Sequence, residues 1–220
     1  MTFEHEREQM IADIESGVAL TRAMTGRDHL DPRVMEAVRK VPREDFVPDN
    51  IRGSAFRDGA LPVGHGQTIS QPYIVALMTD LLELSEDSIV LEIGTGTGYQ
   101  AAILSQLTRQ VYSIERIPEL ARAAQQRLGE MGYENVETRC SDGYLGWPEK
   151  APFDAIVVTA AAPEIPPALL EQLKPGGRMV IPIGLPYSHQ ELMLVTKDPH
   201  GKTDTHDILG VAFVPMVEGA

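Results

Sequence analysis

The sequence predicts an α/β fold with a doubly wound, mostly parallel sheet, and three observations support this prediction. Short apolar runs suited to buried strands alternate with segments of helical periodicity between residues 67 and 183. The run at residues 153–159 is almost continuously apolar, as expected for a strand covered on both faces. A strand, a glycine-rich loop and a helix follow one another at residues 89–107. Such alternation is typical of parallel sheets flanked by helices.

Two helices are expected ahead of this core. Residues 3–23 space apolar side chains among charged ones, which predicts an amphipathic helix that ends near Gly26. Asp31 and the proline after it form an N-cap and first helical position, and this second helix should stop before the next proline. The many glycines and prolines of residues 47–66 predict a loop.

The remaining elements are predicted from apolar periodicity and from turn residues. One helix is expected to follow Gln71, two more to span residues 99–107 and 118–131, and a fourth to end at residue 173. The expected strands are residues 89–93, 110–115, 136–140, 153–159 and 178–183, and a turn at 174–177 precedes the last of them. Two further strands, 191–196 and 208–214, flank a polar turn at 198–204 and should form a hairpin. We therefore expect one domain, with helices and a loop over residues 1–66, a core over 67–183 and C-terminal strands over 184–220.

The length, apolar content and net charge of the chain limit the kinds of partner that it can have. A chain of 220 residues with 43% hydrophobic content fits one globular domain. The net charge of −13, without a cluster of lysine and arginine, argues against nucleic acid as a partner. No apolar stretch is long enough for a membrane span, and residues 1–17 are charged, so we expect a cytoplasmic protein without a membrane partner.

Neither the cysteine nor the histidines indicate a metal. Cys140 is the single cysteine, so it has no internal disulfide partner, and we expect it to be a small buried residue at a strand end. The six histidines are scattered without ligand spacing. The sequence predicts no metal site.

Gly94, Gly96 and Gly98 form the loop after the strand at residues 89–93. Glycine lets a ligand approach the backbone closely, and the next helix offers unpaired N–H groups. The spacing is Gly-x-Gly-x-Gly and not the GxGxxG of dinucleotide-binding units, which favours S-adenosylmethionine over NAD. Because plain turns and helix caps also contain glycine triplets, the neighbouring residues decide between these interpretations.

An acidic residue stands at or just after the end of each of the next two predicted strands. Glu115 ends the strand at residues 110–115, seventeen positions after Gly98, where a carboxylate can accept hydrogen bonds from both ribose hydroxyls. The alternative is a solvated charge at a strand end. Asp142 and Gly143 follow the strand at 136–140, where the aspartate can accept from an adenine amine or simply shape a turn. The glycine loop favours the nucleoside roles.

Ser70 stands immediately before Gln71 and Pro72. As a small polar residue ahead of a proline, it is a candidate helix cap. Its place directly upstream of the predicted cofactor unit also allows it to face a substrate. Both interpretations remain open from the residues alone.

Six segments resemble the protein-L-isoaspartate O-methyltransferases, over about residues 31–217. The most specific is Gly-Gln-Thr-Ile-Ser at residues 66–70, whereas the glycine loop is shared by many methyltransferases. The resemblance is carried by residues 41–47, 60–70, 91–100, 154–162, 174–178 and 213–216. Residues 1–30 are longer than the corresponding segment expected in this family.

The resemblance implies a Rossmann-like, S-adenosylmethionine-dependent methyltransferase with an N-terminal helical extension and C-terminal strands. It implies methyl transfer to the free α-carboxylate of L-isoaspartyl residues in damaged proteins and peptides, which initiates their repair and leaves S-adenosylhomocysteine. We expect a monomer. By the resemblance, Ser70 is catalytic; Thr68, Ile69, Gln71 and Val214 line the substrate groove; and Glu92, Gly94, Thr95, Gly96, Gly98, Glu115, Asp142 and Gly143 bind the cofactor.

Two alternatives stay open. One is another S-adenosylmethionine enzyme, acting on a small molecule or a nucleic-acid amine; amine methylation of bases commonly uses an Asp/Asn-Pro-Pro-aromatic tetrapeptide, where this chain has residues 159–163, Thr-Ala-Ala-Ala-Pro. Cys140, followed by serine, also lacks the proline neighbour of a cytosine-attacking thiol. The other alternative is a non-catalytic, cofactor-binding module, against which the intact segment at residues 67–70 argues.

Overall fold

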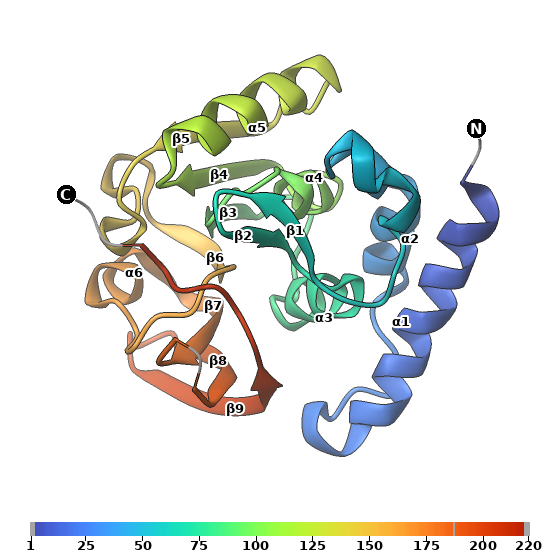
Figure 1. Ribbon diagram of the computed structural model, residues 1–220. Coiled ribbons are helices and arrows are strands. Elements are labelled where there is room, and N and C mark those ends of the chain that lie inside the picture. The colour runs from blue at the N-terminus through green and yellow to red at the C-terminus, as the bar shows by residue number, and fades with distance from the viewer. Residues whose placement is uncertain (1–2, 187, 218–220) are drawn as a thin grey trace.

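The computed structural model describes residues 3–186 and 188–217, and it confirms the predicted α/β fold (Figure 1). The described strands form a seven-stranded sheet in the order β5-β4-β3-β6-β7-β8-β9 and a separate two-stranded sheet, β1-β2. The strands of the large sheet are β3 (Ile89–Ile93), β4 (Gln110–Glu115), β5 (Val136–Cys140), β6 (Phe153–Val158), β7 (Leu173–Gly184), β8 (Gln190–Lys197) and β9 (Thr203–Val211).

Five strands run parallel and the last two are antiparallel. β3 pairs in parallel with both β4 and β6, whereas β7, β8 and β9 form an antiparallel succession. The strand order therefore reverses at β3, which lies between β4 and β6. In open α/β sheets, ligands bind at the carboxyl ends of the strands beside such a reversal.

Helices cover both faces of this sheet (Figure 1). Side chains of successive strand residues point to opposite faces, so Val90 joins a core with the N-terminal helices and Leu91 joins a second core around Trp147 and Leu169. The α-helices are α1 (Glu4–Thr25), α2 (Pro32–Lys40), α3 (Pro72–Leu81), α4 (Tyr99–Ser105), α5 (Pro118–Glu130) and α6 (Pro167–Gln172).

The predicted helix boundaries in the N-terminal region are confirmed. α1 ends at Thr25 and is capped by Gly26, whose φ of 66° is left-handed and whose N–H bonds to Arg22 O at 2.9 Å. Asp31 caps α2 by accepting from the Arg33 N–H at 2.8 Å, with Pro32 at the first helical position. In the described chain, every helix is too short or too polar to cross a bilayer.

The segment predicted as a loop contains further structure. Short 3-10 helices occur at Arg43–Asp45 and Asp49–Ser54, and β1 (Leu61–Gly64) pairs with β2 (Gln67–Ile69) as a hairpin. Three successive residues with positive φ, Gly64, His65 and Gly66, make its turn. The glycines and prolines that suggested a loop therefore shape a tight hairpin, which Figure 1 shows in front of the large sheet.

Three other expectations are wrong in detail. The expected turn at residues 174–177 lies within β7, where the pairing with β6 is irregular. β9 spans Thr203–Val211 and not the expected 208–214. Its first residues are exposed and polar, as is common in an edge strand, so the sequence pattern suggested a turn there. Cys140 is exposed and not buried, because β5 forms the other edge of the sheet.

Substitution of two glycines tests the packing behind the loop that follows β3. Gly98 and Gly132 both have positive φ, but a Cβ at Gly98 would lie 3.1 Å from Leu128, whereas nothing lies within 4 Å at Gly132. We expect Gly132→Ala to lower the free energy of unfolding by about 1–2 kcal/mol and Gly98→Ala to lower it by about 1–3 kcal/mol more. Urea unfolding of both variants measures the difference; equal losses would contradict this packing.

Candidate active site

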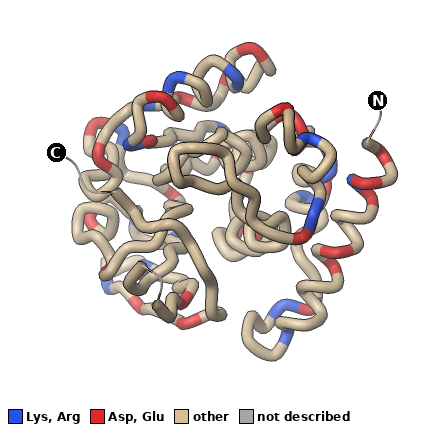
Figure 2. Tube along the Cα trace, in the orientation of Figure 1, with Lys and Arg blue, Asp and Glu red and all other residues tan. Residues whose placement is uncertain are grey.

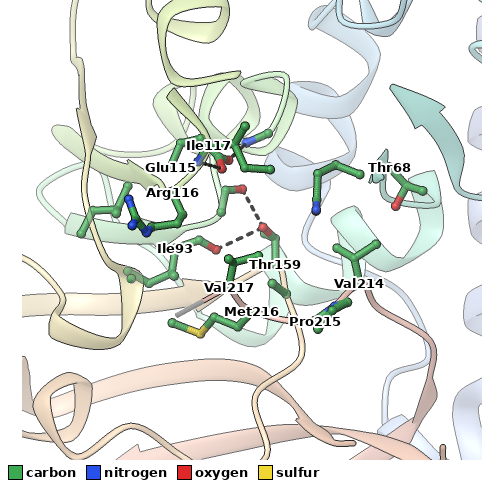
Figure 3. Close-up of a pocket in the computed structure, with 16 residues that line it drawn as sticks. Thr68, Ile93, Glu115, Arg116, Ile117, Thr159, Val214, Pro215, Met216 and Val217 are labelled. Atoms are coloured by element: carbon green, nitrogen blue, oxygen red, sulfur yellow. Dashed lines mark hydrogen bonds between the residues drawn. The ribbon is translucent and has the colours of Figure 1, made fainter. Parts of the chain in front are cut away.

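A cleft opens at the carboxyl ends of β3, β4 and β6, where the strand order reverses (Figure 3). Its walls come from segments far apart in sequence: the β1-β2 hairpin, the loops after the three strands and the chain beyond β9. The lining residues are Gln67, Thr68, Ile93, Gly94, Gly96, Ile114, Glu115, Arg116, Ile117, Gly143, Thr159, Ala160, Val214, Pro215, Met216 and Val217.

The glycine loop after β3 requires glycine for two reasons. Gly94, Gly96 and Gly98 all have positive φ, at 96°, 55° and 92°. A Cβ at Gly94 would also lie 2.4 Å from Thr159 Oγ1, so no other residue fits there without displacing β6's exit loop. The Thr159 hydroxyl lies 2.7 Å from Gly94 O, which fastens the loop to the strand beside it.

Glu115 joins the loop to the end of β4. Its Oε2 accepts from the Gly96 N–H at 2.8 Å and its Oε1 accepts from the Ile117 N–H at 2.9 Å. The side chain lines the cleft and is 7% exposed. Each carboxylate oxygen has a second lone pair, so Glu115 can accept further hydrogen bonds from a ligand in the cleft.

Glu92 lies beneath the glycine loop and does not line the cleft. Its carboxyl group is fully buried and accepts from the Ser113 hydroxyl, which in turn lies 2.6 Å from the hydroxyl of Thr95. Burial, together with the nearby charge of Glu115, raises the pKa of Glu92 to about 8. Glu92 therefore supports the loop from below as a neutral acid near pH 7.

A junction pocket adjoins the cleft and leads toward a larger groove. We use this name for the space lined by Thr68, Ile69, Ser70, Val75, Gly94, Thr95, Gly96, Thr97, Tyr99, Gln100 and Thr159. The groove has a volume of about 710 Å³, within the range of ligand sites, and lies between α1, the start of α3 and β9. Thr68 lines all three spaces, and Ser70 lines the junction pocket and the groove.

Ser70 is held through its own backbone. α3 begins at Pro72 with Gln71 at its N-cap position, so Ser70 lies outside the helix cap. Arg43 donates from Nη2 to Ser70 O at 2.7 Å and from Nε to Ala55 O at 2.8 Å. The Arg43 guanidinium is fully buried and stacks 4.7 Å from the centre of the Tyr99 ring. This arrangement fixes the backbone that carries the Ser70 hydroxyl.

The other predicted residues lie around the same site. Gln71 lines the groove and donates to Asp58 Oδ1 at 2.7 Å, while Val214 and Gly143 line the cleft. Asp142 caps the short helix Gly143–Leu145 by accepting from the Tyr144 N–H at 2.9 Å. Gly98 is the N-cap of α4 and packs on Leu128 behind the loop.

Several lining residues had no signal in the sequence pattern. Arg116 and Ile117 follow Glu115 directly, and adjacency to a predicted ligand was the one signal that could have indicated them. Thr159 follows β6 and meets the glycine loop across 65 positions of sequence. Residues 213–217 cross from β9 to the cleft; of these the sequence indicated Val214, which was expected to line the groove and lines the cleft instead.

Potential metal ligands do not gather at this site or elsewhere in the described ranges, 3–186 and 188–217. Across them, no three His, Cys, Asp or Glu side chains are placed to hold one ion. The polar groups of the cleft are instead backbone amides, hydroxyls, the amide of Gln67, the guanidinium of Arg116 and the carboxylate of Glu115. Such groups suit an uncharged polar ligand such as a nucleoside.

A reversing parallel sheet, a glycine loop after β3 and an acid at the end of β4 define a Rossmann-like methyltransferase. The sequence model of the family "Protein-L-isoaspartate(D-aspartate) O-methyltransferase (PCMT)" matches residues 19–220. The chain belongs to this family and is a methyltransferase, as the sequence predicted.

Curated relatives carry the same family name. Protein-L-isoaspartate O-methyltransferase 2 of Syntrophobacter fumaroxidans is 58% identical over 97% of this chain and 86% of its own length. The enzyme of that name from Nitrosococcus oceani is 56% identical over 94% of both chains. The similarity therefore includes the N-terminal region that precedes the family match at residue 19.

Solved structures agree on the fold. One protein-L-isoaspartate O-methyltransferase superposes with a TM-score of 0.81 at 30% identity; the match covers 95% of this chain and 65% of the length of that one. A putative enzyme of this family from Plasmodium falciparum, in complex with S-adenosyl-L-homocysteine, has a TM-score of 0.76 at 23% identity, covering 94% and 98% of the two chains. The second likeness supports the Rossmann-like fold alone.

The buried acid beneath the loop predicts a pH-dependent stability. Unfolded Glu92 ionises near its ordinary pKa of about 4.3, whereas the native state keeps the proton up to about pH 8. The native state therefore binds more protons across this window, and the free energy of unfolding contributed by Glu92 falls as pH rises. Between pH 5 and pH 8 we expect the wild type to lose up to about 1.4 kcal/mol per pH unit more than Glu92→Gln.

Glu92→Gln is the matched variant because its amide oxygen still accepts from Ser113 while the group no longer titrates. Urea unfolding of both proteins at several pH values gives the two slopes. Parallel slopes would show that Glu92 is already ionised in the native state.

Proposed function

We propose that this chain transfers the methyl group of S-adenosylmethionine to the free α-carboxylate of L-isoaspartyl residues in damaged proteins and peptides, the first step of their repair. The observation that carries the proposal is that neighbouring spaces share lining residues: Thr68 lines the cleft, the junction pocket and the groove, and Ser70 lines both the pocket and the groove. The names of the relatives support the substrate. The glycine loop and Glu115 support the cofactor.

The residues of the cleft fit S-adenosylmethionine. Glu115 offers its free lone pairs to the ribose hydroxyls, and Gly94 and Gly96 line the cleft without side chains, so a ligand can contact the loop backbone there. Gly143 and Asp142 are the proposed adenine side, and Thr95 and Gly96 line the path toward the junction pocket. When bound, the cofactor supplies an electrophilic methyl group on a sulfonium.

The reaction needs alignment more than acid–base chemistry. A carboxylate with a pKa near ~4 is ionised at neutral pH, so attack on a methyl group requires no general base. Among the described residues that line the junction pocket, Tyr99 alone has a titratable side chain, and burial raises the pKa of its hydroxyl. The pocket must hold the carboxylate in line with the methyl group and exclude water.

Ser70 performs that alignment in our proposal. Ser70 lines both the junction pocket and the groove, so its hydroxyl can donate one hydrogen bond to a substrate carboxylate held there. Arg43 keeps the Ser70 backbone in place from the protein interior. A charge-assisted hydrogen bond contributes about 1.5–3 kcal/mol.

Specificity for isoaspartate would come from main-chain geometry. The isoaspartyl linkage adds a methylene to the backbone, so a groove that fixes the flanking peptide places the α-carboxylate at Ser70, and a normal aspartate arrives displaced. An error of about 1 Å can cost about a hundredfold in rate. β9 is an edge strand whose residues Leu209–Val211 border the groove, which suits a peptide that binds as an added strand.

We further propose that the chain acts as a monomer on proteins and peptides in the cytoplasm, and not on nucleic acid. The exposed free thiol of Cys140 supports a reducing compartment. The net charge of −13 supports a protein substrate over a polyanion, and Figure 2 shows acidic and basic residues interspersed along the described chain.

Replacement of Glu115 tests the cofactor site. Because an amide cannot reproduce both acceptor oxygens, Glu115→Gln should raise the S-adenosylmethionine Kd by about tenfold. Glu119→Gln, an exposed change on α5, is the control and should leave the Kd unchanged. Calorimetric titration measures both; wild-type affinity in Glu115→Gln would return Glu115 to a role in loop structure alone.

Replacement of Ser70 tests the proposed reaction. Loss of one hydrogen bond to the substrate carboxylate should lower kcat/KM for an isoaspartyl peptide by roughly 10- to 150-fold in Ser70→Ala, without changing cofactor affinity. Ser105→Ala removes a buried hydroxyl that bonds to Ala102 O, away from the site, and serves as the control. An unchanged rate for Ser70→Ala in a labelled-methyl assay would remove Ser70 from the mechanism.

A further inference from the structure

The chain beyond β9 forms a strap, which we define as residues 213–217. It leaves the sheet after Val211 and pairs with the loop that follows β6: the Ala161 N–H bonds to Val214 O at 2.8 Å, and the Met216 N–H bonds to Ala161 O at 2.8 Å. The strap therefore bridges the edge of the sheet and the site at its centre, and Figure 3 shows Val214, Pro215, Met216 and Val217 beside Thr159.

The strap lines both binding spaces. Phe213 lines the groove together with Ser70, and residues 214–217 line the cleft together with Glu115. Met216 also packs close to Gly143, since a Cβ at that glycine would lie 2.9 Å from Met216 Cε. A displacement of the strap would change the groove and the cleft at once.

One side chain holds the start of the strap. Gln190, on β8, donates from Nε2 to Phe213 O at 3.1 Å and accepts from the Phe213 N–H at Oε1 at 2.6 Å. It is 3% exposed, so water cannot replace these bonds cheaply. Because the ladder between β8 and β9 ends at the Gln190–Val211 pair, the side-chain amide continues the pairing where the backbone no longer does.

We propose that Gln190 is a positioning residue for peptide binding, which it controls by fixing Phe213 and the strap against the groove. An uncharged amide is suited to this role because it donates and accepts within one plane, as the Phe213 peptide group requires. Gln190 lines the groove but neither the cleft nor the junction pocket, so its loss should weaken binding while Ser70 and the glycine loop keep the transfer geometry. The inference rests on the proposed function for its peptide substrate.

Two variants test this role. Gln190→Met keeps the length of the side chain and loses both hydrogen bonds, and Gln190→Glu keeps its volume and loses the donor when ionised. For an isoaspartyl peptide at pH 7.5, we expect KM to rise about tenfold in both, with kcat within about threefold of wild type. As pH falls to 5.5, the buried carboxyl of Gln190→Glu regains a proton and a donor, so its KM should recover while that of Gln190→Met does not.

Gln172 supplies a matched control. It is also buried and also holds a loop through both amide atoms, accepting from the Trp147 N–H at 2.7 Å and donating to Leu145 O at 2.8 Å, but it does not line the groove. We expect Gln172→Met to lower the Tm without raising the peptide KM. The flanking pair His189 and Glu191 is the same in every variant.

The outcomes separate the inference from the reaction on which it rests. An unchanged peptide KM in both Gln190 variants, with a loss of Tm like that of Gln172→Met, would overturn the positioning role. If the wild type methylates no isoaspartyl peptide, the proposed function fails, and the Kd for S-adenosylhomocysteine then tests the strap. A Kd raised severalfold in Gln190→Met would still support Gln190 as the residue that holds the strap, and an unchanged Kd would overturn it.

Discussion

The candidate site depends on how the glycine loop is held at the carboxyl end of β3. Three residues with positive φ bend the chain there, and acidic side chains secure it on two sides: Glu115 accepts from Gly96 N–H at the surface of the cleft, and Glu92 reaches Thr95 through Ser113 from below. One acid faces the cleft and the other is buried. Their environments give the two carboxyl groups different tasks: Glu115 faces the cleft as an acceptor for a ligand, and Glu92 is a neutral support inside the protein.

The substrate side is organised by a buried cation and a buried amide. Arg43 fixes the carbonyl of Ser70, and Gln190 fixes the peptide group of Phe213 on the opposite wall of the groove. Both act on backbone atoms of the groove wall; Arg43 does so from the protein interior, whereas Gln190 also lines the groove. A reaction that requires alignment and no proton transfer benefits from such rigid walls.

The fold was largely predictable because local patterns determine it. The apolar run Ile89–Ile93, the glycine triplet and the helix after Pro118 each carry their signal within a few residues. β9 was placed incorrectly because its first residues are exposed and polar, and the β1-β2 hairpin was missed because its glycines resemble a loop. Edge strands and short hairpins lack the burial that produces a readable pattern.

The site was predictable only in part, for a related reason. Glu115 and Gly94 lie beside a recognisable loop, and the segment ending at Ser70 resembles a known family, so the sequence indicated them. The contacts of Arg43 with Ser70 and of Gln190 with Phe213 span 27 and 23 positions and involve backbone atoms of the partner, which leave no trace in residue types. The raised pKa of Glu92 likewise follows from complete burial, which its position in a strand alone does not show.

In the proposed reaction, the groove presents an isoaspartyl α-carboxylate to a methyl donor bound in the cleft. The most direct test is methyl transfer from labelled S-adenosylmethionine to two synthetic peptides that differ only in aspartate or isoaspartate at one position. We expect transfer to the isoaspartyl peptide alone. Equal transfer to both peptides, or transfer to neither while S-adenosylhomocysteine still binds, would contradict it.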